Sequence, residues 1–145
     1  MMTSGDFIRL SSRWCTLIHP NGDEAVWRTA ISRAYYGAFH SAQGFLNQLQ
    51  IAFPKRENEH KFVCEALYNS KDVDITAAAS KLFELRKNRN CADYDLLTAM
   101  DVPPLAKECH ADAVQICAFI SQCPVARHPA IRSEILTWRK IQYQF

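Results

Sequence analysis

Residues 27–49, WRTAISRAYYGAFHSAQGFLNQL, decide the fold of this chain. The apolar positions in this stretch recur every three or four residues, which is the spacing of one face of an α-helix. They are Trp27, Ile31, Ala34, Tyr35, Ala38, Ala42, Phe45, Leu46 and Leu49. The pattern predicts a long helix over about residues 23–50, with one continuous face buried in a core.

Helical patterns also cover most of the chain on both sides of that stretch. They predict helices over residues 5–18, 74–90, 102–122 and 129–141, and a shorter helix after Pro54 that carries Phe62 and Val63. Asp74 or Thr76 is expected to cap the helix over 74–90. No alternating β-branched run with hairpin turns is present in the sequence. We therefore predict a single domain over residues 1–145, an all-α antiparallel bundle of five or six helices.

Composition excludes several classes of protein. The 145 residues are 48% hydrophobic and 22% charged, which is enough apolar material for a real core. The net charge of +2 provides no overall basic field, so any site for a polyanion must be a local patch. No apolar run approaches the roughly 20 residues of a membrane span, and no secretory signal is recognisable. We expect a cytoplasmic protein that does not contact a membrane.

The six cysteines lie at positions 15, 64, 91, 109, 117 and 123. They form no CxxC pair, and no Cys/His set has zinc-finger spacing. We expect free thiols that pack as small apolar residues. No metal site and no cofactor is predicted.

The segment with most chemical character is residues 85–95, LRKNRNCADYD. It places Arg86, Arg89, Asp93 and Tyr94 within ten residues. Guanidinium groups match phosphate oxygens well and are costly to bury without a partner. The alternative is structural, because Arg89 and Asp93 are four apart and can form an ion pair within one helix. The sequence leaves both interpretations open.

Three blocks together resemble the HEPN family of helical domains. They are residues 28–42 (RTAISRAYYGAFHSA), residues 59–63 (EHKFV) and the pattern LRxxRxxADYD at 85–95. The resemblance spans roughly residues 27–97. It implies an antiparallel four-helix core with one or two extra helices, and a homodimer from a toxin–antitoxin or antiphage system. It also implies metal-independent RNA cleavage at a cleft in the dimer interface.

The resemblance assigns residue roles to the 85–95 segment. Arg86 and Arg89 match the arginine of the family's ribonuclease motif, and Asn90 matches the polar residue that follows it. The motif histidine is missing, and Asp93 and Tyr94 stand where it is expected. The predicted catalytic residues are therefore Arg86, Arg89, Asp93 and Tyr94.

A second stripe on the long helix could complete this site. Arg33, Tyr36 and His40 are spaced so that they lie beside the apolar face. With Asn90 they are the predicted substrate-binding residues, and His40 could provide the missing imidazole if this stripe faced the arginines. The alternative is that His40 is a hydrogen-bonded surface or interface residue. His60 is expected to be exposed or to make a local hydrogen bond.

Two functions follow from these patterns. The first is binding of RNA or nucleotide phosphate, with metal-free RNA cleavage as its stronger form. The second is a non-catalytic helical dimerisation module that binds a protein partner encoded in the same operon, such as a nucleotidyltransferase. The missing histidine favours the second over cleavage, and the two arginines favour some contact with an anion.

Overall fold

The computed structural model describes residues 2–17, 23–55 and 58–144. Within these ranges the regular structure consists of six α-helices and one short 3-10 turn, with no strand, so the predicted all-α class is confirmed. The helices are α1 (Ser4–Leu17), α2 (Glu24–Gln48), α3 (Glu59–Tyr68), α4 (Val73–Tyr94), α5 (Val102–Ser121) and α6 (His128–Tyr143). The 3-10 turn, Val125–Arg127, comes directly before α6.

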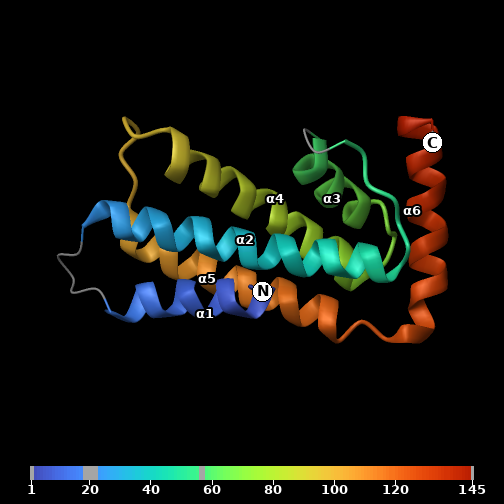
Figure 1. Ribbon diagram of the computed structural model, residues 1–145, viewed down its shortest axis with the longest axis horizontal. Coiled ribbons are helices and arrows are strands. Elements are labelled where there is room, and N and C mark those ends of the chain that lie inside the picture. The colour runs from blue at the N-terminus through green and yellow to red at the C-terminus, as the bar shows by residue number, and fades with distance from the viewer. Residues whose placement is uncertain (1, 18–22, 56–57, 145) are drawn as a thin grey trace.

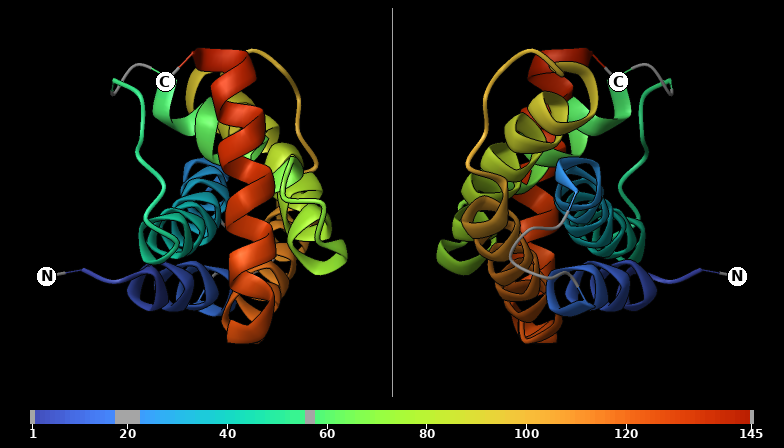
Figure 2. Two further views of the ribbon diagram at one scale, coloured as in Figure 1. Left: turned by 90° about the vertical axis from the view of Figure 1, so that its right-hand side faces the viewer. Right: turned by 90° about the vertical axis from the view of Figure 1, so that its left-hand side faces the viewer.

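Four long helices, α1, α2, α4 and α5, form the bundle (Figure 1). Helices α1 and α4 run in one direction, and α2 and α5 run in the other. Helix α3 is short and packs against α4 and α2. Helix α6 crosses one end of the bundle and contacts α3, as Figure 2 shows. The described residues thus form a four-helix bundle with two additional helices.

Helix α2 is the centre of the bundle and contacts α1, α3, α4 and α5. All nine apolar residues predicted for its inner face are buried, which confirms the pattern of residues 27–49. Gly37 allows α1 to approach closely, because a Cβ added there would lie 2.6 Å from Cδ1 of Ile8. A side chain at this position would therefore push α1 away from α2.

Helix α4 begins earlier and ends later than the sequence predicted. Its N-terminal cap is Asp72, whose carboxylate accepts hydrogen bonds from the backbone N–H groups of Asp74 and Ile75, both at 3.1 Å. The predicted caps Asp74 and Thr76 are therefore wrong. The helix continues past residue 90 to Tyr94, which puts the whole 85–94 segment on one helix.

The late end of α4 is fixed by an arginine from α2. Arg28 is only 6% exposed, and its Nη1 donates to the carbonyls of Cys91 (3.0 Å), Ala92 (3.3 Å) and Asp95 (3.1 Å). Its Nη2 donates to the carbonyl of Thr98 at 3.0 Å. These oxygens lie at or after a helix C-terminus, where backbone carbonyls need partners and a positive charge is favourable. Arg28 therefore caps α4 from a neighbouring helix.

The cysteines whose side chains are described are free, as predicted. These are Cys64, Cys91, Cys109, Cys117 and Cys123. Burial raises the pKa of the Cys64 thiol to about 12, so this thiol packs as an apolar group. None of the described helices combines the length and the apolar character that crossing a membrane requires.

Candidate functional site

The fold brings most of the predicted site residues to one place, where α2, α3 and α4 meet. At its centre are Tyr35 and Tyr36 of α2, Arg86 and Arg89 of α4, and His60 of α3. We call these five residues the arginine–tyrosine cluster. Arg86 and Arg89 are three residues apart on α4, so both face the same neighbouring helices.

Arg89 is held by groups of its own chain. One of its terminal nitrogens, Nη2, donates to the Tyr36 hydroxyl, and the other, Nη1, donates to the side-chain oxygen of Asn90 at 3.0 Å. Its Nε lies 3.0 Å from the Asp93 carboxylate, although the N–H is not directed for a hydrogen bond. The guanidinium carbon lies 5.6 Å and 5.1 Å from the ring centres of Tyr35 and Tyr36. The predicted Arg89–Asp93 ion pair is confirmed.

The electrostatics of Arg89 follow from these contacts. Burial opposes its charge, but Tyr36, Tyr94 and Asp93 outweigh burial and raise the pKa of Arg89. The Asp93 carboxylate also accepts a hydrogen bond from the Ser32 hydroxyl at 3.1 Å. The Asp93 carboxylate is therefore occupied by a cation and a hydroxyl donor of its own chain.

Arg86 differs from Arg89, although it is only one turn away. Its side chain is half-buried and makes no hydrogen bond or ion pair with any of the described residues. It lies close enough to Tyr35, His60 and Cys64 for its charge to act on all three. None of these three groups is an acid at neutral pH. The positive charge of Arg86 is therefore left without a carboxylate partner in this part of the chain.

His60 is the functional candidate that the sequence-based site did not include. Its Nδ1 lies 2.8 Å from the hydroxyl of the buried Tyr35, 25 positions away on α2, so the bond is long-range and the predicted local hydrogen bond is wrong. Its ring stacks on Phe39 with centres 4.3 Å apart. The sequence already contained one signal, because His60 belongs to a block that resembles a known family. Its place beside the arginines depends on how α3 docks on α2 and α4.

His40 packs beside Tyr36 on α2 and is hydrogen-bonded to Gln43. Its ring centre is 6.2 Å from that of Tyr36 and 5.2 Å from that of Phe7, and its Nδ1 is 3.2 Å from the Gln43 side chain. Arg33 is placed over the ring of Phe7, with a distance of 5.9 Å to the ring centre. Tyr36 is therefore the residue of this stripe that contacts Arg89, and the imidazole of His40 is hydrogen-bonded to Gln43.

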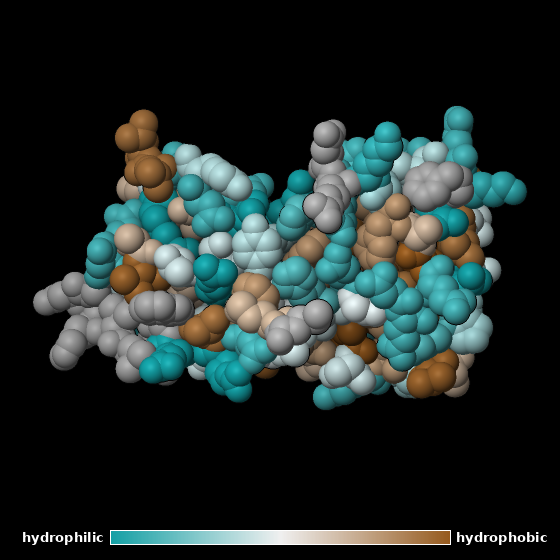
Figure 3. Space-filling model, viewed as in Figure 1, coloured by the Kyte–Doolittle hydropathy of each residue, from teal (hydrophilic) through white to brown (hydrophobic). Residues whose placement is uncertain are grey.

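The end of the motif segment is exposed and apolar. Tyr94 is 72% exposed and lies beside Arg89, with 5.2 Å between the guanidinium carbon and the ring centre. Leu96 and Leu97 follow it and are 72% and 98% exposed. Figure 3 shows an apolar group protruding at the corner where the α4–α5 connection lies in Figure 1. Because Arg28 fixes this connection, the two leucines are held outside the core.

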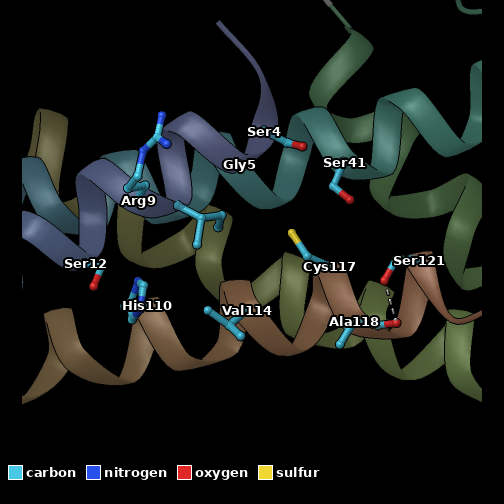
Figure 4. A pocket seen from close by; sticks show the side chains of 11 residues that line it. Ser4, Gly5, Arg9, Ser12, Ser41, His110, Val114, Cys117, Ala118 and Ser121 are labelled. Carbon is cyan, nitrogen blue, oxygen red and sulfur yellow. Dashed lines mark hydrogen bonds between the residues drawn. The ribbon is translucent and has the colours of Figure 1, made fainter.

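A separate pocket of about 570 Å³ opens between α1 and α5 and includes Ser41 of α2 (Figure 4). His110 and Val114 line it from α5, and Ile8 and Ser12 line it from α1. Burial lowers the pKa of His110, and its Nδ1 is buried with no hydrogen-bond partner among the described groups. None of the predicted site residues lines this pocket. It is therefore distinct from the arginine–tyrosine cluster.

Within the described ranges, no group of three His, Cys, Asp or Glu side chains is arranged to hold a metal ion. The protein is an all-α helical bundle, and the arginine–tyrosine cluster is its candidate site. No family model, curated protein or solved structure matches the chain.

Proposed function

We propose that this protein binds RNA or nucleotide phosphate at the arginine–tyrosine cluster. The observation that carries the proposal is Arg86, a half-buried residue whose guanidinium has no hydrogen-bond or ion-pair partner among the described residues. A guanidinium in such surroundings gains most from an anion that accepts two parallel hydrogen bonds, and a phosphate group does this well. Arg89, one turn away, is already bound by the Tyr36 hydroxyl, the Asn90 side chain and the Asp93 carboxylate.

The resemblance to HEPN domains supports the biological setting of this proposal. In that setting the protein is a homodimer and belongs to a toxin–antitoxin or antiphage system. The local chemistry favours binding over cleavage. Metal-free cleavage of RNA needs a base for the 2′-hydroxyl, and Asp93 is already paired with Arg89 and Ser32.

The test is the affinity for a fluorescently labelled single-stranded RNA, measured by anisotropy at low salt. Arg86→Met keeps the aliphatic stem and removes the charge. It should weaken binding about tenfold or more, the scale expected for one charge-assisted phosphate contact. Lys87→Met is the matched control, since Lys87 is exposed and is the next residue on the same helix. If both variants lost RNA affinity equally, the binding would be nonspecific attraction to positive charge and the proposal would fail. If neither variant lost affinity, the proposal would also be excluded.

A second function is favoured by a different observation, the exposed group formed by Tyr94, Leu96 and Leu97. Large apolar side chains gathered on a surface mark sites for other proteins. In this alternative the protein is a non-catalytic dimerisation or interaction module, and the partner is a second copy or a nucleotidyltransferase. Leu96→Asp combined with Leu97→Asp should then abolish the complex in light scattering or co-purification while leaving the helical content unchanged. A complex that survives the double variant would contradict this alternative.

A further inference from the structure

We propose that His60 and Arg86 form a two-donor subsite for one phosphate group of RNA, with Tyr35 holding His60 in the form that carries its proton on Nε2. The subsite binds the phosphodiester without taking a proton from the RNA. This inference rests on the proposed function and specifies which groups contact the ligand and what they do there.

The first step concerns the direction of the Tyr35–His60 hydrogen bond. Tyr35 is fully buried, and a buried hydroxyl needs an acceptor for its hydrogen. Its hydrogen-bond partner is Nδ1 of His60, at 2.8 Å. Burial raises the pKa of Tyr35 well above its ordinary value, so the hydroxyl keeps its proton. Tyr35 therefore donates, Nδ1 accepts, and a neutral His60 carries its proton on Nε2.

The second step is that the imidazole ring is fixed in place. Phe39 stacks on it with centres 4.3 Å apart and an angle of 28° between the planes. Tyr36 meets it edge-on at 6.2 Å. The hydrogen bond from Tyr35 sets the rotation of the ring, and the stacking sets its plane. The ring is half-buried, so part of its edge is open to solvent.

The third step is the charge state of the ring. Burial lowers the pKa of His60, and the charges of Arg89, Arg86 and His40 lower it further, against the opposing effect of Glu59. Glu59 is itself bound by the side-chain amide of Gln43. The balance leaves His60 neutral at physiological pH. A neutral imidazole with Nδ1 occupied is a hydrogen-bond donor only.

The fourth step is the ligand. Arg86 offers donors and no acceptor, and His60 offers one donor, so the pair presents hydrogen atoms alone. Such a pair suits an oxyanion and repels a metal ion. Phosphate oxygens can accept from the guanidinium and the imidazole together. The lone pair that a general base needs is already used by Tyr35, so the bound RNA is expected to stay intact.

The experiment begins with the unmodified chain of residues 1–145, labelled with nitrogen-15. A long-range proton–nitrogen NMR spectrum distinguishes protonated from unprotonated ring nitrogens for each histidine. We expect one histidine with a proton on Nε2 and an unprotonated, hydrogen-bonded Nδ1, and this pattern should disappear in His60→Gln. A proton on Nδ1 of His60 would overturn the inference. The protonation state is read from the unmodified chain, and His60→Gln serves only to assign the signal to His60.

Binding of labelled oligouridylate then tests the role of the donor. His60→Ala should weaken binding about threefold to tenfold, the scale of one hydrogen bond between a neutral donor and an anion. His60→Gln should retain most of the affinity, because its amide nitrogen takes the place of Nε2. His110→Gln, in the separate pocket, is the matched control and should bind as the unmodified chain does.

The outcomes separate the two proposals. If Arg86→Met weakens binding but both His60 variants bind normally, the proposed function stands and this inference fails. If Arg86→Met has no effect, the proposed function itself fails. Recovery of shortened RNA after incubation with the unmodified chain, absent with His60→Gln, would show that His60 acts as a base and would overturn the inference.

Discussion

Arg28 and Arg86 are two arginines in one bundle with opposite surroundings. Arg28 is 6% exposed and donates to four backbone carbonyls and to Glu24, so its charge is used within the chain. Arg86 is half-buried and makes no such contact among the described residues. Arg89 is intermediate, because it is bound by Tyr36, Asn90 and Asp93 at the edge of the cluster. Burial alone therefore does not identify a functional arginine, and its hydrogen-bond partners must also be compared.

The comparison predicts a graded loss of stability when each arginine is replaced by methionine. The largest loss is expected for Arg28→Met. This change removes the donor from the carbonyls of Ala92, Asp95 and Thr98 and leaves the Cys91 carbonyl with the backbone N–H of Asp95 alone, and it should cost about 3 kcal/mol. Denaturant unfolding followed by circular dichroism measures it. Lys107→Met, at an exposed position of α5, is the control and should change stability by less than about 0.5 kcal/mol.

Arg89→Met should cost less, about 1–2 kcal/mol. The change removes the hydrogen bond to Tyr36 and the ion pair with Asp93, both at a side chain that is 13% exposed. Asp93→Asn removes only the ion pair and should cost below about 1 kcal/mol. If the two variants were equally destabilised, the contact with Tyr36 would contribute nothing, and Arg89 would then resemble Arg86 more than Arg28.

A pH dependence should accompany the neutral state of His60. Burial lowers the pKa of His60, with further lowering by Arg89 and Arg86, and burial also lowers the pKa of His110. The unfolded chain has histidines near the ordinary value of about 6.5, so it binds protons more readily than the folded chain below that value. Stability should therefore be full above about pH 6.5 and should fall as the pH drops toward the folded values.

The unfolding midpoint in urea at several pH values measures this effect. His60→Gln combined with His110→Gln should give a flatter profile than the unmodified chain. An unchanged profile would mean that neither imidazole is held neutral by the fold.

The smallest effect on stability is expected for Arg86→Met, within about 0.5 kcal/mol. No described partner loses a hydrogen bond in this variant, and the methionine keeps the apolar stem in place. The same unfolding measurement applies, now paired with the RNA-binding assay. A loss as large as that of Arg89→Met would mean that Arg86 braces the bundle, and the proposed phosphate site would be withdrawn.

Several features of this protein could be predicted from particular residues. The nine-residue apolar face of α2 is buried as its spacing indicated, because a helical period is a local property of the chain. The Arg89–Asp93 pair also follows from local spacing, since residues four apart on a helix are neighbours. The caps of α4 were placed wrongly because Asp72 and Asp74 are both acceptable caps in sequence, and only the backbone geometry distinguishes them.

The candidate site was predicted only in part. The sequence pointed to Arg86, Arg89 and Tyr36 and offered His40 as the imidazole, whereas in the fold His60 is bound to Tyr35 and has its pKa lowered by the charges of both arginines. The role of Arg28 was missed for a similar reason. Its partners are more than 60 residues away along the chain, so no local pattern reveals them.

The helices, their buried faces and the two arginines on one turn of α4 could be predicted from residue spacing, because these properties depend on a single helix and not on the arrangement of the others. The partners of the arginines could not be predicted in this way. Arg89 is bound by Tyr36, Asn90 and Asp93, whereas Arg86 has no hydrogen-bond or ion-pair partner among the described residues. Partner choice depends on the docking of α2, α3 and α4, and hydrogen bonds act over about 3 Å, so small differences in packing determine whether a charge is satisfied.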